Sequence, residues 1–312
     1  ATIELLSGPG CPVCVTDNAD LDKAIALAQL PDVILATFGD MLKVPGSRSS
    51  LQEVKADGAD IRIVYSTTDA LQVARENPTK SVVFLGIGFE TTAPTIAASI
   101  RQAEQEEIKN YYVLSLHKLG PPVIKALLNS GEVKLSGLIC PGHVSAIIGS
   151  KPWDFIARDY GIPCVVSGFE PLDVLQCIDM LVAQIEQEDS RVEIAYRRGV
   201  RPEGNRSALE LMEQVFEACP ARWRGIGVVP NSGLKIRKEF ERFDAELTFE
   251  FDPGPAFEPK GCICGDILRG VKTPQDCQLF AKVCTPERPV GPCMVSSEGS
   301  CAAYYLYGAD YE

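Results

Sequence analysis

Cysteine is the residue that most strongly suggests chemistry in this chain, and it is unevenly placed. Six of the twelve cysteines lie between Cys262 and the C-terminus. So many thiols in a short segment of a chain that otherwise reads as intracellular favour metal binding over disulfides. Four of them form a Cys-x12-Cys-x6-Cys-x16-Cys series, which consists of Cys264, Cys277, Cys284 and Cys301.

The spacing of this series indicates which metal is bound. Structural zinc sites take their ligands in close pairs, about two to four residues apart, and the first three cysteines of the series are farther apart than that. Four thiolates supplied by turns and a short helix are common ligands of a 4Fe-4S cluster. We therefore expect Cys264, Cys277, Cys284 and Cys301 to bind such a cluster.

The residues between these cysteines predict their local structure. Thr273-Pro274 is a helix start signal, which would put Cys277 and Cys284 on a helix and at its end. Cys262 and Cys293 fall outside the series and are expected to be bystanders. Two alternatives stay open: a zinc site assembled from another subset of the six cysteines, and six thiols that are simply reduced.

A second cysteine motif, Cys11-Pro12-Val13-Cys14, stands between a predicted strand and a predicted helix start at residues 16–18. A Cys-x-x-Cys in this position is typical of a redox pair, because the helix N-terminus stabilises the thiolate of Cys11 or Cys14. The alternative is a zinc site in which Cys140 and His143 supply the other two ligands. We favour the redox pair.

One tripeptide occurs twice, as Gly88-Phe89-Glu90 and Gly168-Phe169-Glu170, and each copy leads from a predicted strand into a predicted helix. The glycines suit tight turns, which would leave Glu90 and Glu170 over the end of a sheet. A carboxylate there relays protons or binds a metal-bearing ligand, whereas elsewhere it caps a helix or lies on the surface. The duplication favours a site role for both.

The chain has two histidines, His117 and His143, and both follow predicted strands. A single histidine in a fold is usually structural, but its near-neutral pKa and its affinity for metals also suit it to sites. His143 lies within Pro141-Gly142-His143-Val144-Ser145, beside the expected cleft. We therefore predict it as a site residue and rank His117 below it.

Short apolar runs alternate with amphipathic stretches up to about residue 188, which predicts an α/β fold with mainly parallel sheets. Nearly every unusual motif directly follows a run, and ligands bind beyond the carboxyl ends of strands in such folds. We expect two similar α/β halves with a cleft between them. The predicted strands are Ile3–Leu6, Val33–Phe38, Ile61–Tyr65, Val82–Ile87, Tyr111–Leu116, Leu135–Cys140 and Cys164–Ser167.

Three domains are expected: residues 1–107 with the Cys-x-x-Cys, residues 108–197 as the second α/β domain, and residues 198–312 as an α+β, loop-rich iron-sulfur domain. In the third, Ser207–Ala218 predicts a helix, and Ile226–Val229 predicts a strand that ends at Asn231-Ser232-Gly233. From Asp252 onward the chain is rich in Pro and Gly, as in small domains that need a metal to hold their shape.

Charge and hydropathy argue against nucleic acid and membranes as binding partners. The chain carries 42 acidic and 30 basic residues and a net charge of -12. Nucleic acid and anionic membrane surfaces need concentrated Lys and Arg, so neither is expected as a partner. No apolar run approaches the ~18 residues of a membrane-spanning helix. We expect a cytoplasmic protein with reduced thiols.

Taken together, these motifs resemble those of the HypD family, the maturation proteins of NiFe-hydrogenases. The resemblance runs from about Ile3 to Tyr307, and the combination of the first motif with the cysteine series makes it specific. The motifs that carry it are Gly8-Pro9-Gly10-Cys11-Pro12-Val13-Cys14, Gly88-Phe89-Glu90-Thr91-Thr92, Pro141-Gly142-His143-Val144-Ser145, Ser167-Gly168-Phe169-Glu170-Pro171 and the four-cysteine series.

The resemblance implies a scaffold on which the Fe(CN)2CO group of the hydrogenase is assembled, with a HypC-type chaperone and a HypE-type cyanide donor as partners. It assigns the 4Fe-4S ligands to Cys264, Cys277, Cys284 and Cys301 and the redox-active dithiol to Cys11 and Cys14. A transient iron that bears cyanide and CO is expected in the cleft, with Glu90, His143 and Glu170 around it.

One feature of the family is missing. Its members carry an upstream Cys-Gly-Thr-His segment whose cysteine is thought to hold the iron, and this sequence starts after it. We expect either that upstream residues are absent from the sequence or that iron attachment has been lost.

Three functional hypotheses follow. In the first, the cluster passes electrons to the Cys11/Cys14 pair, which supports redox chemistry at a bound iron. In the second, the protein is a non-catalytic module that docks the chaperone with its iron, and the cluster is purely structural. In the third, it is a zinc-dependent enzyme that uses Cys11, Cys14, Cys140 and His143. We favour the first, because two separate thiol sets exceed what docking requires.

Overall fold

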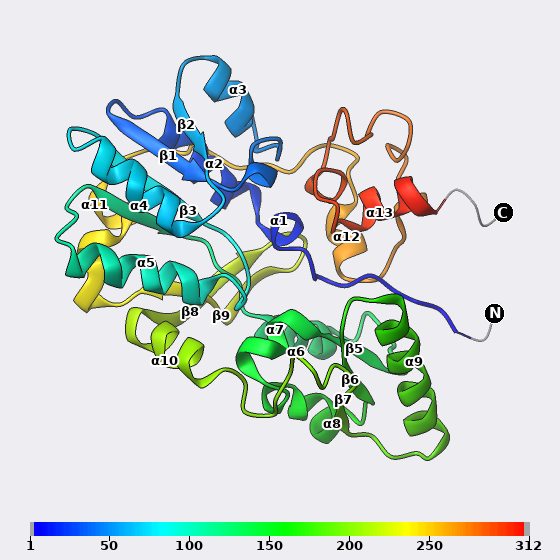
Figure 1. Cartoon of the computed structure of the whole chain (residues 1–312). Coiled ribbons are helices and arrows are strands. Elements are labelled where there is room, and N and C mark those ends of the chain that lie inside the picture. Colours follow the sequence, from blue (N-terminus) through cyan, green and yellow to red (C-terminus); the bar gives the residue numbers. More distant parts are fainter. Residues whose placement is uncertain (1–2, 309–312) are drawn as a thin grey trace.

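The computed structural model describes residues 3–308, which form two parallel α/β regions and a loop-rich tail (Figure 1). The α/β class is confirmed, because the sheets β2-β1-β3-β4 and β5-β6-β7 contain only parallel pairs, whereas β8 and β9 pair antiparallel. The strands are β1 (Val33–Thr37), β2 (Asp60–Ile63), β3 (Ser81–Gly86), β4 (Tyr111–Ser115), β5 (Leu138–Pro141), β6 (Cys164–Ser167), β7 (Val192–Ile194), β8 (Phe216–Trp223) and β9 (Gly227–Ile236).

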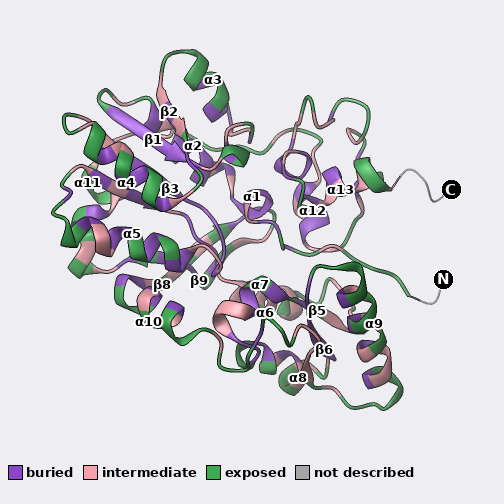
Figure 2. Ribbon diagram, in the orientation of Figure 1, coloured by how far each residue is buried: buried purple, intermediate pink, exposed green. Residues whose placement is uncertain are grey.

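The four-stranded sheet is covered on both faces. Leu35 and Leu85 pack with α2 (Asn18–Ala28) and α3 (Leu51–Ala56) on one face. Ile34 and Phe84 pack with α4 (Thr67–Glu76) and α5 (Ala93–Gln105) on the other. Burial on both faces explains why β1 is an unbroken apolar run, and the strand interiors are coloured as buried in Figure 2. The apolar spacing in the sequence predicts one helical face in α2 and one in α5, and both are buried: Leu21, Ala24, Ile25 and Ala28 in α2, and Ile96, Ile100 and Ala103 in α5.

The second sheet is smaller and is surrounded by four longer helices and a short 3-10 turn. Its last strand, β7, was not predicted, because only three residues pair. Strand β4 follows residue 107 but pairs with β3, so the first sheet extends past that predicted boundary. The helices are α6 (Gly120–Ser130), α7 (Gly142–Ile148), α8 (Asp154–Tyr160) and α9 (Pro171–Glu186), and the turn is η2 (Lys151–Trp153).

The antiparallel hairpin corrects two predictions. The helix expected over Ser207–Ala218 is α10 (Arg206–Val215), and the chain then continues directly as β8. The strand expected to end at residue 231 instead runs to Ile236. A register shift between Cys219 and Ala221 accommodates the turn-like residues 231–233 within the ladder. Phe216, Leu234 and Ile236 join the core beside α5.

The tail is built from short pieces: α12 (Cys264–Leu268), η4 (Pro274–Asp276), η5 (Pro292–Met294) and α13 (Ser300–Tyr307). The predicted helix through Cys277 and Cys284 is wrong. The start signal is real, since Thr273 and Asp276 form a capping box, but it yields one 3-10 turn that ends before Cys277. Ala281 then adopts φ 56°, a left-handed conformation that no α-helix continues through.

Two further expectations concern the start of the chain and the membrane. Residues 3–6 form no strand, and Ile3, Leu5 and Leu6 are exposed. The strand predicted for Ile3–Leu6 is therefore wrong, because these residues do not pair with any described strand. Among the described helices, none combines the length and the apolar character needed to cross a bilayer.

Candidate functional site

The Cys-x-x-Cys motif forms the start of a single helical turn, α1 (Pro12–Val15), in which Cys11 and Cys14 are joined in a disulfide. Cys11 is the N-cap, and its sulfur accepts a hydrogen bond from the Cys14 N–H at 3.2 Å. Both residues are buried, with exposed fractions of 4% and 0%. The pair is therefore held in the interior and reaches solvent almost nowhere.

This turn lies directly against the tail of the chain. Helix α1 packs on α12 and η5, and Figure 1 shows it between the first α/β region and the tail. The Cys14 sulfur is 3.9 Å from the carbonyl oxygen of Pro292, the residue before Cys293. The structure thus brings the predicted redox pair next to the segment that carries the predicted cluster ligands.

The four predicted ligands, Cys264, Cys277, Cys284 and Cys301, are all buried and free of disulfides. Burial first, and then repulsion from the neighbouring thiolates, raises the pKa of Cys301 above its ordinary value. The same two causes raise the pKa of Cys262 to about 12. Because the charges of Cys264, Cys262, Cys284 and Cys277 all act on Cys301, these five cysteines form one electrostatic group.

The surroundings of this group suit thiolates. A hydrogen bond with Cys293 lowers the pKa of Cys264 against the effect of burial, and the positive charge of Arg224 acts in the same direction. The Val290 N–H donates to the Cys284 sulfur at 3.3 Å. A Cβ on Gly291 would lie 2.6 Å from the Cys262 sulfur, so only glycine fits there.

The chemistry of the four predicted ligands, which are buried thiols without disulfides, is compatible with the predicted iron-sulfur cluster. Among residues 3–308, no three His, Cys, Asp or Glu side chains are grouped so that they would hold one metal ion. In a 4Fe-4S cluster each thiolate binds its own iron, which requires a wider cage of buried sulfurs. Mutually repelling thiolates also favour a cationic iron core between them.

The alternative zinc site is not assembled. Cys11 and Cys14 are joined to each other. Cys140 is buried, and its pKa is raised mainly by a hydrogen bond with Cys164 on the adjacent strand. His143 instead stacks on Phe169, with ring centroids 3.8 Å apart.

The first Gly-Phe-Glu turn buries its carboxylate. Glu90 Oε1 accepts the backbone N–H of Gly120 at 2.9 Å and so caps α6, whose next two residues are prolines without an N–H. Glu90 Oε2 has no hydrogen-bond partner among the described residues. Burial raises the pKa of Glu90 to about 7. This side chain therefore exchanges a proton near neutral pH.

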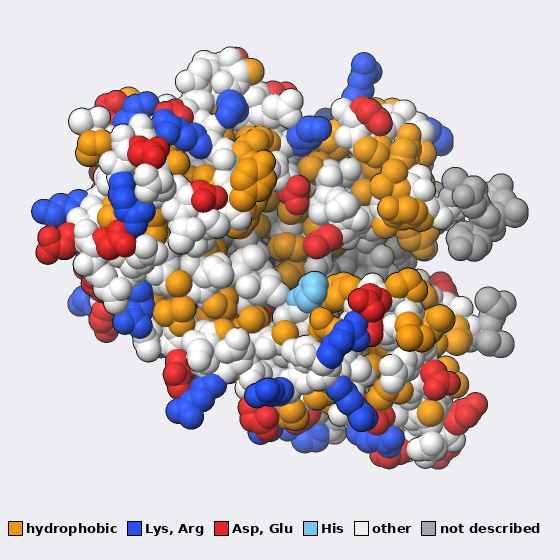
Figure 3. Space-filling model, viewed as in Figure 1, with side chains coloured by type: hydrophobic (Ala, Val, Ile, Leu, Met, Phe, Trp, Pro, Cys, Tyr) orange, Lys and Arg blue, Asp and Glu red, His pale blue; other side chains and the backbone are white. Residues whose placement is uncertain are grey.

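The second turn exposes its carboxylate. The Glu170 side chain is 76% exposed and lies 3.3 Å from Arg198, which also binds the buried Asp173. Phe169 places this turn beside His143. His143 is exposed, whereas His117 is buried, and the histidine colour in Figure 3 lies at the edge of a hollow on this face of the molecule. The two carboxylates were expected to play equivalent roles, but their environments differ.

The two α/β regions are nevertheless connected through these motifs. Gly120, which Glu90 caps, lies against the Trp153 ring. The Trp153 Nε1–H donates to Ser145 Oγ at 3.0 Å, and Ser145 belongs to the same helix as His143. The buried Trp153 therefore links the first Gly-Phe-Glu turn, through Gly120, to the helix that carries the Pro-Gly-His motif.

Arg224 is the residue of this site that the sequence analysis missed. It is buried beside α1 and hydrogen-bonds to the backbone of Cys14 and Thr16. A single arginine after Trp223 forms no recognisable motif. The Gly225-Ile226-Gly227 turn that follows it was the one local signal that this corner of the chain is tightly constrained.

The comparisons with known proteins agree with the motifs. The family model described as "HypD: Hydrogenase formation hypA family" matches residues 1–308. The hydrogenase maturation factor HypD2 of Bradyrhizobium diazoefficiens is 48% identical over 98% of this chain and 83% of its own length. HypD of Cupriavidus necator is 49% identical over the same shares. A putative hydrogenase expression/formation protein of Methanocaldococcus jannaschii is 46% identical over 98% of this chain and 85% of its own.

A family model that covers nearly every residue, together with relatives of almost half identity, leaves one assignment. This chain belongs to the HypD family of hydrogenase maturation factors.

Proposed function

We propose that this protein is a redox scaffold on which the Fe(CN)2CO group is assembled during NiFe-hydrogenase maturation. Its redox-active parts are the Cys11–Cys14 pair and a 4Fe-4S cluster. A HypC-type chaperone and a HypE-type cyanide donor are its partners, and the iron they decorate is a transient substrate. Family membership supports the maturation role, and the arrangement of the thiols supports the redox role.

One observation carries the redox part of the proposal. The Cys14 sulfur lies 3.9 Å from Pro292 O, and α1 packs on both α12 and η5. The residues in contact are 278 positions apart in the chain. A docking module would not need to bury a cysteine pair against a second group of thiols, whereas an electron relay needs this proximity.

Cys264, Cys277, Cys284 and Cys301 would hold the cluster, which supplies single electrons when it is bound. The chain's own residues do the rest. The wall formed by α12 and η5 excludes water from the cysteine pair, and the Cys14 N–H fixes the position of the Cys11 sulfur. Val290 donates an N–H to Cys284, and hydrogen bonds to ligand sulfurs tune the potential of a cluster.

The iron substrate would bind in the hollow beside His143. The histidine ring is fixed by its stacking on Phe169, so that its position is defined before any ligand arrives. Glu90 holds or releases a proton near neutral pH and is linked to this edge through Trp153. Glu170 provides an exposed carboxylate on the same turn as Phe169.

A second function, a redox-inert docking module, is favoured by the burial of the pair. Exposed fractions of 4% and 0% leave Cys11 and Cys14 little access to thiols in solution. If this function is correct, maturation does not depend on the redox state of the pair.

Anaerobic reconstitution with iron and sulfide tests the proposal. We expect a 4Fe-4S EPR signal after reduction that is lost in Cys264→Ser, and a two-electron thiol titration that is lost in the Cys11→Ala/Cys14→Ala variant. In a strain without its own HypD, the double variant should fail to mature hydrogenase. Full maturation by that variant would overturn the relay and support the docking module.

A further inference from the structure

Arg224 places a positive charge inside the protein, beside the cysteine pair. Its side chain is 2% exposed. Its Nε–H donates to the carbonyl of Cys14 at 3.1 Å, and one terminal nitrogen donates to the carbonyl of Thr16 and to Asn18 Oδ1, both at 2.7 Å. The guanidinium thus wraps around the C-terminal end of α1.

The charge of this guanidinium is only partly neutralised. Among residues 3–308 its ion-pair partner is Glu258, whose side chain is 49% exposed and therefore well solvated. The other acceptors are neutral oxygens. A solvated counter-ion only partly offsets the charge of a buried cation, so the cation still interacts strongly with other buried groups in the low-dielectric interior. The guanidinium contacts the cysteine pair directly through the Cys14 carbonyl, and its charge also acts on Cys264.

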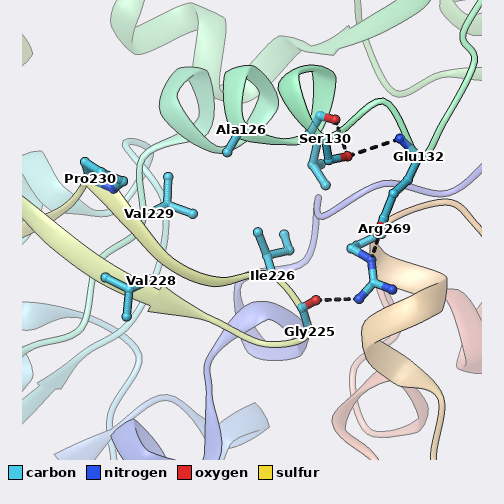
Figure 4. A pocket seen from close by; sticks show the side chains of 10 residues that line it. Ala126, Ser130, Glu132, Gly225, Ile226, Val228, Val229, Pro230 and Arg269 are labelled. Atoms are coloured by element: carbon cyan, nitrogen blue, oxygen red, sulfur yellow. Dashed lines mark hydrogen bonds and ion pairs between the residues drawn. The ribbon is translucent and has the colours of Figure 1, made fainter.

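The same corner of the chain is tied to the tail. Gly225 has φ 72°, and a Cβ on it would overlap Gly265 in α12. The Gly225 carbonyl accepts a hydrogen bond from Arg269, which also pairs with Glu132 at 2.8 Å (Figure 4). These residues border a pocket of about 340 Å³ beside α6. The Arg224 side chain is therefore held by its hydrogen bonds to the α1 turn and Thr16. Its backbone is held by the contacts that the next residue, Gly225, makes with α12.

We propose that Arg224 is a positioning residue that makes the Cys11–Cys14 disulfide easier to reduce. The inference rests on the proposed function in one respect, namely that the pair is redox active. Reduction breaks the S–S bond and adds two electrons and one proton, so that one sulfur becomes a thiol and the other a thiolate. The disulfide is neutral and the reduced pair is anionic. A fixed neighbouring cation therefore favours the reduced pair.

The test is the equilibrium constant for reduction of the pair by dithiothreitol. The full chain is purified anaerobically, with equal iron content in all variants, and is equilibrated in mixtures of reduced and cyclic oxidised dithiothreitol. Acid quenching, alkylation and mass spectrometry of the peptide with both cysteines give the reduced fraction. The two electrons come from dithiothreitol, which closes to its cyclic disulfide.

Two variants should change the equilibrium constant in opposite directions, and a third serves as the control. Glu258→Gln removes the counter-ion from a half-exposed position and should raise the equilibrium constant about tenfold, or about 30 mV in potential. Arg224→Gln should lower it about tenfold. Arg222→Gln removes an exposed arginine from β8, two residues before Arg224, and should change the constant less than twofold.

Glu258→Gln keeps the test decisive even if Arg224→Gln fails to fold. No shift in Glu258→Gln, or a shift toward the disulfide, would overturn the inference while leaving the redox role of the pair intact. A pair that never becomes reduced in the unaltered chain would instead contradict the proposed function, and this inference with it.

Discussion

Two groups of buried cysteines in this molecule have similar exposure but different surroundings. Cys140, Cys164 and Cys177 lie in and beside the second sheet, where strand pairing and helix α9 already define their positions. In the tail, Cys264 and Cys301 lie at the starts of short helices, and the other four cysteines lie in loops and single turns. Buried thiols within regular structure act as small apolar side chains. Buried thiols in loops need something else to hold them, and a metal cluster meets that need.

The most drastic way to test this contrast is to remove one predicted ligand. Cys284→Ser should abolish iron binding and loosen the tail, because the segments from residue 252 onward contain little regular secondary structure. Hydrogen exchange should rise by orders of magnitude in residues 262–301 and stay unchanged in β5 and β6. Cys177→Ser is the matched control with an equally buried thiol. Unchanged exchange in the tail of Cys284→Ser would contradict the contrast.

The attachment of the tail to the rest of the molecule can be tested at one glycine. Gly225→Ala should destabilise the protein by about 3 kcal/mol, since Gly225 is left-handed and its Cβ would overlap Gly265. Gly227 is also left-handed, but its Cβ would meet nothing within 4 Å. Gly227→Ala should therefore lose only about 1 kcal/mol. Denaturant unfolding measures both, and equal losses would exclude a role for the Gly265 contact.

The cysteines of the second sheet should behave as packing groups. Cys164→Ala/Cys177→Ala should lower the free energy of unfolding by about 2 kcal/mol through the cavities it leaves, with no change in iron content. Unfolding curves and iron analysis of the same samples provide the measurement. Loss of iron in this variant would show that the two groups are not independent.

The last effect concerns Glu90, and it is small per pH unit because it is spread over a range of pH. Its pKa is raised from 4.5 to about 7 in the folded state, so the folded protein binds more protons than the unfolded chain between these values. Stability from this group is complete below pH 4.5 and falls as the pH rises toward 7, by at most about 1.4 kcal/mol per pH unit. Glu90→Gln should flatten this slope in urea titrations. An unchanged slope would assign it to another group.

Regular elements were predictable because their pattern is local. β6 was predicted residue for residue, and the buried faces of α2 and α5 follow from spacing alone. The failures share a cause. Thr273-Pro274 started a helix as expected, but the tail's packing ended it before Cys277, and the ladder of β8 and β9 overrode a turn signal at Asn231. Tertiary contacts decide where both elements end, and these contacts cannot be inferred from the neighbouring residues in the sequence.

The candidate site was predictable in part. The spacing of the cysteines selected four residues that are all buried in the tail. The Cys-x-x-Cys was expected between a strand and a helix start at residues 16–18, but it forms a helical turn of its own, α1, and residues 3–10 contain no strand. The contact between the two sets could not be predicted, since it joins positions 278 residues apart. The sequence also could not predict that Glu90 is buried and Glu170 exposed, because both residues belong to the same Gly-Phe-Glu tripeptide.

The cover over Cys14 comes from the opposite end of the polypeptide, and this has a consequence for synthesis. A ribosome that adds about 5 to 20 residues per second delivers Pro292 tens of seconds after Cys14. Until then the nascent chain presents Cys11 and Cys14 without their lid, open to cellular oxidants and thiols. The oxidation state in which the pair is first enclosed therefore depends on the redox conditions that the growing chain meets.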